Sequence, residues 1–557
     1  MAEMGVGIED VVELEQQQPY RTGYHFQPPN NWMNDPNGPM YYKGVYHLFY
    51  QYNPRGPIWG NIAWAHSISY NLIDWDHVDI ALSPTDPELD INGCFSGSTT
   101  LLQDDKLAIL YTGKNCRNHQ VQNLATPVNL SDPFLREWTK SSLNHMTPND
   151  IDPTKFRDPT TAWLGPDNMW RTAIGAKMVT GKWVPLLYTS SDFKHWTRST
   201  KTPFGLLLEN NELVLECVDF FPVGINSSDG DNRYSNKDQY KNKFALKVSF
   251  QHNERECYVL GQYSPEKEEF KAESSDFNFR IDYGKFYASK SFYDPEKKRR
   301  VIWGWIMESE SRADDIKKGW SGLMSFPRTI VLSKSGKQLV QWPIKEIEKL
   351  RGEEVSVHNK ELYFGSIFEI SGITPSQADV EVSFQIDVDE LREAEPMDPS
   401  WVDPQVLCDE KNASVKGIFG PFGLKVLASE DLSEQTSIFF RIFKINDNEY
   451  KVVIGSDQSR SSLRDGLNKT TYGAFLDLDP RLEKITLRTL IDHSIVESFG
   501  GEGRSCITAR VYPKLAINKA AHLYAFNYGT KSVKIFNLKA WSVNNAQFVT
   551  RREERNH

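Results

Sequence analysis

The stretch Val45–Pro54 reads VYHLFYQYNP, an extended run of aromatic and β-branched residues that ends at a turn. Such a run is typical of a buried β-strand. Four further segments share this composition: LAILYTG from Leu107, MWRTAIGAK from Met169, ECYVLGQY from Glu256 and RVIWGWIM from Arg300. Repeated β units at intervals of several tens of residues, with no helical periodicity between them, predict a β-propeller.

A change of pattern near residue 345 marks a domain boundary. The segment PIKEIEKLRGEE is the best helix candidate in the chain, with Pro343 at its start and Ile344, Ile347 and Leu350 on one side. Later segments, such as DVEVSFQIDV and EYKVVIGS, alternate apolar and polar residues, which predicts antiparallel strands of a β-sandwich. We therefore expect an all-β chain with a flexible N-terminal extension over residues 1–19, a propeller over 20–345, a helical linker over 346–354 and a sandwich over 355–557.

The composition is that of a soluble globular protein, with 39% hydrophobic and 25% charged residues in a chain of 557. A formal net charge of -10 argues against a nucleic-acid partner or an acidic membrane surface. There is no apolar run of about eighteen residues, so we expect no membrane span. The acidic N-terminus lacks the features of a signal peptide. The six cysteines show no C-x-x-C spacing, which argues against a zinc ribbon or a redox pair.

Three acidic residues lie in constrained, aromatic-rich surroundings. Asp35 in WMNDPNG lies against a Pro-Asn-Gly turn and is expected to stay a carboxylate that can act as a nucleophile. Glu216 in LVLECVDFFPV is embedded in an apolar strand, which should raise its pKa and suit a general acid. Asp158 in FRDPTTAW follows Arg157, which should hold it ionised. An Asp before Pro is more often a turn residue, and Glu216 could equally be a paired strand acid.

One protonated and one ionised carboxyl group form the arrangement that glycosidases use, and retaining enzymes hold the two about 5–5.5 Å apart. Together and in this order, WMNDPNG, FSGS (Phe95–Ser98), FRDP, EC and WGW (Trp303–Trp305) resemble plant enzymes of glycoside hydrolase family 32. These are invertases, fructan exohydrolases and fructosyltransferases. The resemblance runs from about Tyr20 to about Trp541 and implies a five-bladed β-propeller followed by a β-sandwich. It implies no metal or organic cofactor.

The resemblance also implies roles for individual residues. Asp35 would attack the anomeric carbon of a fructosyl unit, and Glu216 would protonate the leaving oxygen and later deprotonate the acceptor. Asp158 would hold fructose hydroxyls, with Arg157 orienting it. Positions that match the fructose pocket and its rim are Trp32, Asn34, Gln51, Trp59, Trp64, Phe95, Ser96 and Tyr283.

The choice between hydrolysis and transfer depends on the residues around this trio. Family invertases carry an acid and a Lys or Arg three residues later, which bind the glucose half of sucrose; here Gln251 and Glu254 stand at those positions. Leu215 and Phe95 replace tryptophans of relatives. These changes favour a fructosyltransferase with sucrose as donor and sucrose or fructan as acceptor, building levan-type linkages. A fructan exohydrolase, an invertase and a non-catalytic sugar-binding relative stay open as alternatives.

Four N-glycosylation sequons, at Asn129, Asn226, Asn412 and Asn468, favour the secretory route. The sequence pI of about 5.7 predicts the vacuole, with the cell wall as the alternative. Relatives pair a cysteine at the position of Cys408 with one at the position of Gly455, so we expect no such disulfide here. The sequence leaves the oligomeric state open, and we expect a monomer.

Overall fold

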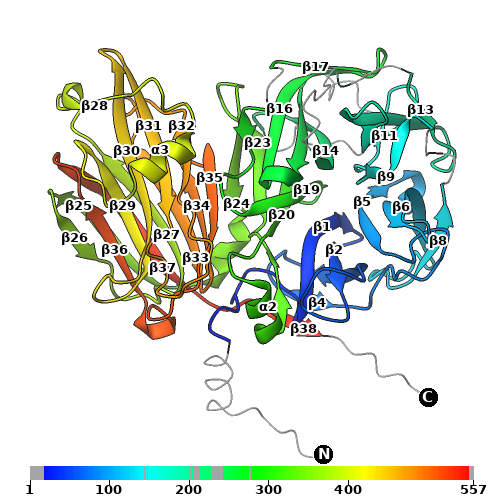
Figure 1. Cartoon of the computed structure of the whole chain (residues 1–557), viewed down its shortest axis with the longest axis horizontal. Helices are drawn as coiled ribbons and strands as arrows, with labels where there is room; N and C mark the ends of the chain where they lie inside the picture. The colour runs from blue at the N-terminus through cyan, green and yellow to red at the C-terminus, as the bar shows by residue number, and fades with distance from the viewer. Residues whose placement is uncertain are drawn as a thin grey trace, which may run out of the picture. The chain divides into compact units, whose positions relative to one another are not determined.

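The computed structural model describes residues 18–143, 146, 149–200, 204, 214–226, 242–274 and 277–550. The chain divides into two compact units. The five-sheet unit comprises Phe26–Met307, Gly319–Ile347 and Ala546–His557, and the two-sheet unit comprises Met1–His25, Glu308–Lys318 and Glu348–Asn545. Both units are built almost entirely of β-strands (Figure 1). The described α-helices are α2 (Arg312–Lys318) and α3 (Pro404–Glu410).

The described part of the five-sheet unit contains five sheets, each built mainly of antiparallel neighbours in chain order. The first runs β21 (Trp320–Ser321), β1 (Asn31–Tyr42), β2 (Val45–Asn53), β3 (Ala63–Ser69), β4 (Trp75–His77), β38 (Phe548–Thr550). The second runs β5 (Cys94–Leu101), β6 (Leu107–Lys114), β7 (Gln120–Pro127), β8 (Trp138–Ser142). The third runs β10 (Trp163–Leu164), β11 (Trp170–Met178), β12 (Trp183–Ser190), β13 (Thr197–Arg198), with β9 (Ile151–Arg157) also paired to β11.

The fourth and fifth sheets complete this unit. The fourth runs β14 (Leu215–Val223), β15 (Lys243–Phe250), β16 (Arg255–Ser264), β17 (Glu269–Ala272), with β18 (Phe279–Arg280) paired to β16. The fifth runs β19 (Phe286–Asp294), β20 (Arg299–Ile306), β23 (Arg328–Leu332), β24 (Leu339–Pro343), with β22 (Leu323–Met324) paired to β20. Short 3₁₀ helices in the unit are η1 (Gln103–Asp105), η5 (Gln251–Asn253) and η6 (Lys345–Leu350).

The first strands of these sheets contact one another in a closed series. β1 contacts β5, β5 contacts β9, the third sheet contacts β14 through β11, β14 contacts β19, and β19 returns to β1. Apolar side chains fill the space between neighbouring sheets; Phe49 and Trp64 of the first sheet, for example, pack with Ile109 and Tyr111 of the second. Strands covered on both faces need no polar face, which explains why β2 reads as a continuous aromatic run.

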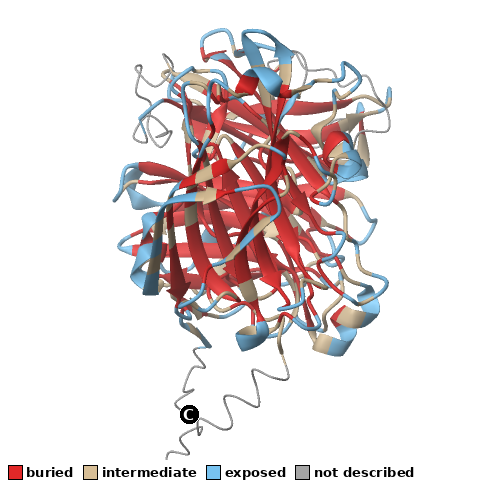
Figure 2. Ribbon diagram, turned by 90° about the vertical axis from the view of Figure 1, so that its left-hand side faces the viewer, coloured by how far each residue is buried: buried red, intermediate tan, exposed pale blue. Residues whose placement is uncertain are grey.

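The two-sheet unit is a β-sandwich. One sheet runs β25 (Arg351–Leu362), β37 (Val533–Val543), β27 (Gln377–Gln385), β33 (Ile485–Asp492), β34 (Ile495–Gly500), β35 (Ser505–Arg510). The other runs β26 (Ser366–Glu369), β36 (His522–Asn527), β29 (Phe419–Ala428), β30 (Thr436–Asn446), β31 (Glu449–Asp457), β32 (Tyr472–Leu476), with β28 (Glu395–Pro396) paired to β30. Short 3₁₀ helices are η7 (Leu391–Glu393) and η8 (Asn518–Ala520). Figure 2 shows that its strands are largely buried and that exposed residues gather in the loops.

Residues at the edges of the predicted domains are placed differently from the expectation. Residues 1–17 of the predicted extension lie outside the described residues. Residues 18–25 belong to the two-sheet unit, where the backbone N–H groups of Gly23, Tyr24 and His25 donate to the Asp492 carboxylate. The helix expected over 346–354 is the short η6, because from Arg351 onward the backbone pairs with β37. Strand β38 near the C-terminus pairs with β4 of the five-sheet unit.

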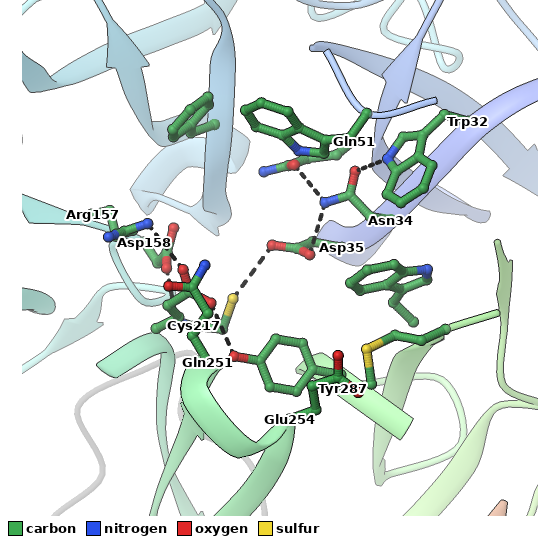
Figure 3. Close-up of a pocket in the computed structure, with 15 residues that line it drawn as sticks. Trp32, Asn34, Asp35, Gln51, Arg157, Asp158, Cys217, Gln251, Glu254 and Tyr287 are labelled. Carbon is green, nitrogen blue, oxygen red and sulfur yellow. Dashed lines mark hydrogen bonds and ion pairs between the residues drawn. The ribbon is translucent and has the colours of Figure 1, made fainter. Parts of the chain in front are cut away.

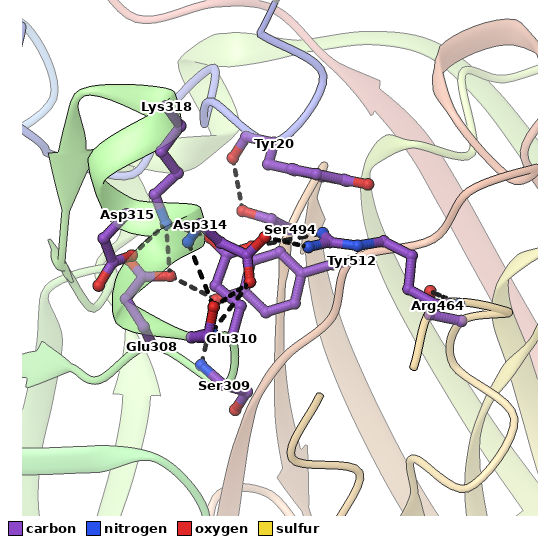
Figure 4. A network of polar contacts seen from close by, with 12 residues as sticks. Tyr20, Glu308, Ser309, Glu310, Asp314, Asp315, Lys318, Arg464, Ser494 and Tyr512 are labelled. Atoms are coloured by element: carbon purple, nitrogen blue, oxygen red, sulfur yellow. Dashed lines mark hydrogen bonds and ion pairs between the residues drawn. The ribbon is translucent and has the colours of Figure 1, made fainter. Parts of the chain in front are cut away.

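Residues 308–318 also belong to the two-sheet unit, and a buried polar network explains this (Figure 4). Lys318 Nζ lies 3.0 Å from Glu308 Oε2 and 2.9 Å from Asp315 Oδ1, and it also contacts Glu310. Arg510 Nη1 lies 2.9 Å from the second oxygen of Glu308. Arg464 Nη1 lies 3.3 Å from Glu310 Oε2. Glu308, Glu310 and Asp315 are close enough together to share an ion, but Lys318, Arg510 and Arg464 already supply three positive charges to these three carboxylates.

The predicted modification and cysteine sites are found as follows. Asn129, Asn226 and Asn468 are exposed, and Asn412 is half-buried. Cys408 is a buried thiol, and a Cβ atom at Gly455 would lie 3.1 Å from its Sγ. Within the described residues, no helix is long and apolar enough to cross a membrane.

Candidate active site

The five-sheet unit contains a cavity of about 460 Å³ to which all five sheets contribute. Asp35 comes from β1, Phe95 from β5, Glu216 from β14 and Tyr287 from β19, while Asp158 follows the end of β9. Figure 3 shows Asp35, Asp158 and Tyr287 pointing into the same space. The other lining residues are Trp32, Asn34, Gln51, Trp59, Arg157, Cys217, Gln251, Glu254, Trp305 and Met307. The three predicted acids therefore meet, although up to 181 positions separate them in the sequence.

Four of the strands that line the cavity, β1, β5, β14 and β19, each contain an irregularity in their pairing, and these irregularities turn side chains toward the cavity. The register shifts between Met33 and Pro36 in β1, between Cys94 and Gly97 in β5, between Glu216 and Asp219 in β14, and between Tyr287 and Lys290 in β19. A bulge of this kind re-aims the side chains next to it. Asp35, predicted beside a tight turn, is thus held in a bulged strand.

The backbone near the cavity also adopts an unfavourable conformation. Asp158, Cys217 and Ala288 have φ angles of 65°, 47° and 53°, in the left-handed region. This conformation costs a non-glycine residue about 1–2 kcal/mol. The surrounding contacts must therefore stabilise it, and they hold the catalytic candidates in place.

The Asp35 carboxylate is surrounded by hydrogen-bond donors. Ser96 Oγ donates to its Oδ2 atom over 2.5 Å, and Asn34 Nδ2 donates to its Oδ1 atom over 3.0 Å. The thiol of Cys217 lies 3.4 Å from Oδ2. Burial raises the pKa of this thiol well above its usual value, so it stays protonated and can donate. Three donors leave Asp35 with one defined orientation, as a nucleophile requires.

A second layer of hydrogen bonds fixes these donors. Trp32 Nε1 donates to Asn34 Oδ1 over 2.7 Å, and Asn34 Nδ2 donates to Gln51 Oε1 over 2.6 Å. Gln51 Nε2 in turn donates to Ser96 Oγ over 2.6 Å. The chain determines which end of each amide faces Asp35, so Trp32, Asn34, Gln51 and Ser96 act as a group.

Glu216 lies in a different environment. Its side chain is 13% exposed, and burial raises its pKa to about 7. Arg157 opposes this rise with an ion pair of 2.9 Å to Oε1, while the negative charges of Asp158 and Asp35 add to it. Tyr287 donates its hydroxyl to Oε2 over 2.9 Å and lowers the pKa slightly. Glu216 therefore holds a proton up to near neutral pH, as the sequence predicted and as a general acid requires.

Asp158 is 3% exposed and lies deep in the cavity. Burial raises its pKa, while Arg157 and a 2.8 Å hydrogen bond from the Cys217 backbone N–H oppose the rise. We expected Arg157 to hold Asp158 ionised. The expectation was wrong. Arg157 does lower the pKa of Asp158, but burial outweighs this and raises the pKa overall, and the ion pair of Arg157 is with Glu216.

Three residues predicted for the pocket do not line the cavity. Ser96 donates a hydrogen bond to the Asp35 carboxylate but is not itself part of the cavity lining. Trp64 is completely buried and supports the pocket indirectly, by donating from Nε1 to the backbone oxygen of Phe95 over 3.0 Å. Tyr283 lies under the Arg280 guanidinium, 5.2 Å from its ring centroid. The bulge in β19 brings Tyr287 into the cavity instead.

Several residues that line the cavity were not predicted as pocket residues from the sequence. Tyr287 and Met307 lie in ordinary apolar segments that carry no signal of function. Trp305 and Cys217 were quoted only as parts of the WGW and EC motifs. The position of Cys217 directly after Glu216 was the one signal that could have identified it.

The rim of the cavity carries an ion pair that the sequence did not reveal. Glu254 follows η5 with a left-handed backbone, and its Oε2 atom lies 3.1 Å from Lys285 Nζ. Gln251 lies beside it in the same lining. Trp59 is 56% exposed and packs edge-on against Phe95. An exposed tryptophan suits the face of a sugar ring.

Comparison with known proteins identifies the class. The N-terminal domain of glycosyl hydrolases family 32 matches residues 25–343, and the C-terminal domain matches residues 346–542. The chain therefore belongs to glycoside hydrolase family 32.

Its relatives include an insoluble-isoenzyme β-fructofuranosidase of Arabidopsis thaliana, 53% identical over 95% of this chain and 91% of the relative. A fructan 6-exohydrolase of Beta vulgaris is 52% identical over 97% and 89%. The crystal structure of fructan 1-exohydrolase IIa from Cichorium intybus superposes with a TM-score of 0.91 at 49% identity, covering 96% of this chain and 99% of that one.

These comparisons correct the predicted activity. We expected a fructosyltransferase building levan-type linkages, because Gln251, Glu254 and Leu215 depart from the invertase pattern. The relatives at about half identity are named as β-fructofuranosidases and fructan exohydrolases. The expectation was therefore wrong, since loss of the charged couple does not by itself make a transferase.

Proposed function

We propose that this chain is a retaining hydrolase that releases terminal fructosyl units from fructans, and acts on sucrose more slowly. The observation that carries the proposal is that Asp35 and Glu216 line the same cavity, where burial raises the pKa of Glu216 to about 7. A general acid and a nucleophile are what a retaining glycosidase needs.

In the first step, Asp35 attacks the anomeric carbon of the fructosyl unit while the proton of Glu216 passes to the leaving oxygen. The glycosidic bond breaks, and a covalent fructosyl ester forms on Asp35. In the second step, the Glu216 carboxylate takes a proton from water and the water oxygen attacks the same carbon. The ester bond to Asp35 breaks, which releases fructose and restores the Asp35 carboxylate and the Glu216 acid. Asp158 lies deep in the cavity, where it can accept hydrogen bonds from fructose hydroxyls. Glu216 makes both proton transfers, so the scheme requires no cofactor.

We also infer that the five sheets form the blades of a five-bladed propeller. The closed series of contacts among the first strands supports this, because a ring of blades places each first strand next to the axis. The convergence of Asp35, Asp158 and Glu216, from three different sheets, is the expected consequence.

We favour fructan over sucrose as the substrate because the rim of the cavity lacks the charged couple that binds glucose in the invertase pattern. In the invertase pattern an acid and a base grip glucose at the positions of Gln251 and Glu254. Here Gln251 has no charge, and Glu254 is engaged by Lys285. The glucose half of sucrose would therefore lack its charged binding partners. A fructan presents a fructose unit, not a glucose, to this part of the rim. The invertase relatives support sucrose hydrolysis as the second candidate.

The test is to measure initial rates of fructose release from sucrose, 1-kestose and a levan-type trisaccharide. We expect either fructan to be cleaved at least about tenfold faster than sucrose. The matched variant Gln251→Asp/Glu254→Lys restores the couple and should raise the rate on sucrose. Faster release from sucrose, with equal glucose and fructose, would make the protein an invertase. Glucose in excess with new oligofructans would restore the transferase assignment.

We propose the secretory route to the cell wall rather than the vacuole. The exposed sequon residues Asn129, Asn226 and Asn468 support secretion, and a relative from Pisum sativum is named a cell wall isozyme. Fractionation of a tagged protein between wall, soluble apoplast and vacuole tests this. Recovery in isolated vacuoles would contradict it.

A further inference from the structure

A fully buried ion pair lies outside the cavity in the fourth sheet. Lys247 of β15 and Glu256 of β16 are both 0% exposed, and Lys247 Nζ lies 2.9 Å from Glu256 Oε1. Burial alone would lower the pKa of Lys247, but the neighbouring Glu256 raises it above its usual value, so the ammonium stays charged. A buried pair is a poor source of stability, because desolvation offsets the attraction. Its presence here calls for another reason.

The other bonds of Lys247 supply that reason. Its Nζ atom donates to the backbone oxygen of Cys217 over 2.7 Å and to the backbone oxygen of Ser289 over 2.6 Å. The three protons of the ammonium thus have three acceptors. Glu256 Oε1 also accepts from the Ser289 backbone N–H over 2.8 Å and from Ser249 Oγ over 2.7 Å. The pair thus binds the backbone N–H and the backbone carbonyl of one residue in β19, Ser289, and one carbonyl in β14, that of Cys217.

These backbone groups belong to the two bulges that carry the proton-donating apparatus. Cys217, with φ 47°, directly follows Glu216, and Ala288, with φ 53°, stands between Tyr287 and Ser289. Tyr287 donates its hydroxyl to Glu216 across the gap between β14 and β19. The Lys247 ammonium group therefore connects the two bulges that orient the side chains of Glu216 and Tyr287.

We propose that Lys247 and Glu256 are positioning residues that fix Glu216 relative to Tyr287 and so set the aim of the general acid. The proposal rests on the function proposed above. Neither side chain lines the cavity, so neither touches the substrate. An apolar pair of similar size would fill the space but would leave the Cys217 and Ser289 carbonyls without their ammonium donor. The bulges would then be free to relax toward regular pairing.

The experiment compares wild type, Lys247→Met, Glu256→Gln and the double variant Lys247→Met/Glu256→Met, measuring fructose release from 1-kestose and sucrose. The double variant removes both charges, so its fold does not suffer an unpaired buried ion. We expect it to fold, with kcat at least tenfold below wild type and KM within about threefold. We also expect the alkaline limb of its kcat/KM profile to move to lower pH. Once the bulges relax, Glu216 becomes more exposed to water, and the loss of burial lowers its pKa. Glu256→Gln keeps an acceptor oxygen and should be affected least.

The matched control is Asp294→Asn/Arg299→Met/Glu346→Met. It removes another buried charge cluster of the same unit, in which Arg299 bonds Glu346 over 2.9 and 2.6 Å and Asp294 over 3.1 Å, at the end of the β19–β20 hairpin away from Tyr287. Its kcat and pH profile should match wild type. Wild-type activity with an unchanged kcat and pH profile in the Lys247/Glu256 double variant would overturn the proposal. A wild-type protein that released no fructose from either sugar would instead overturn the proposed function. If Lys247→Met fails to fold, the double variant still decides.

Discussion

Two buried glutamates, one in each unit, show how surroundings decide what a carboxyl group does. Glu216 in the five-sheet unit lines a cavity, and its carboxyl group bonds Arg157 and the Tyr287 hydroxyl. Glu434 in the two-sheet unit is 0% exposed and lies outside the described cavities. It accepts four backbone N–H groups, from Leu463, Lys514, Leu515 and Ala516, over 2.6 to 3.2 Å.

The difference lies in what each carboxylate is bonded to. Backbone N–H groups can only donate, and through them Glu434 ties its own loop to Leu463 and to the segment 514–516. Glu216 faces two other acids across a space that water and substrate can enter, which makes its proton exchangeable. Glu434 is therefore placed to stabilise the sandwich, whereas Glu216 is placed as the general acid that we propose.

Asp35→Asn should have the largest effect on activity. The amide keeps the shape of the side chain but cannot form the fructosyl ester, so we expect kcat to fall by about 10⁴-fold or more. Thermal unfolding should change little. Steady-state rates on 1-kestose and an unfolding scan check both, and a residual activity above one per cent of wild type would contradict the role of nucleophile.

Glu434→Ala should separate stability from catalysis. Four buried N–H groups lose their acceptor, so we expect a loss of roughly 3 kcal/mol, which lowers the unfolding midpoint of the two-sheet unit by several degrees. The kcat per folded molecule should equal wild type. Scanning calorimetry and rates on the folded fraction test this, and a wild-type midpoint would show that Glu434 is not a structural tie.

Tyr287→Phe should shift the pH dependence. Glu216 must be protonated in the free enzyme, so kcat/KM falls as the pH rises through about 7. The Tyr287 hydroxyl lowers this pKa, so its removal should move the alkaline limb to higher pH and reduce kcat by about tenfold. A limb that moves to lower pH would contradict the hydrogen bond as its cause.

Lys285→Met should have the smallest effect. It frees Glu254 from its ion pair at the rim without touching the acids of the cavity. We expect KM for fructan to change by about threefold and kcat to stay within a factor of two. A large fall in kcat would mean that Lys285 takes part in the chemistry, which the account does not assign to it.

The sequence predicted much of the fold and the three acids that meet in the cavity, but not the contacts that hold them there. Strands such as β2 could be predicted because continuous apolar runs reflect burial on both faces. Asp35, Asp158 and Glu216 could be predicted because each lies in a short, unusual motif. The positions of Tyr287 in the cavity and of Lys247 against two bulges could not, because the bulges depend on pairing between distant segments. For the same reason, the local sequence does not reveal the bonds from Gly23, Tyr24 and His25 to Asp492.

The specificity prediction failed for a related reason. Gln251 and Glu254, predicted at the positions that bind the glucose half of sucrose, line the cavity, but an altered subsite is compatible with both hydrolysis and transfer. The ion pair with Lys285 comes from a residue 31 positions away from Glu254, and local sequence does not reveal it. Identity of about one half to named hydrolases decided a question that the residues alone left open.

The most direct test of the account is to trap the covalent intermediate. Glu216→Gln is treated with a fructosyl donor whose leaving group needs no proton, such as a fructosyl fluoride. The first step then proceeds while the second lacks its base, so the ester should accumulate. Peptide mass spectrometry should find one added fructosyl group on the peptide that contains Asp35. A fructosyl group on another residue, or fructose release at the wild-type rate with no labelled peptide, would contradict the account.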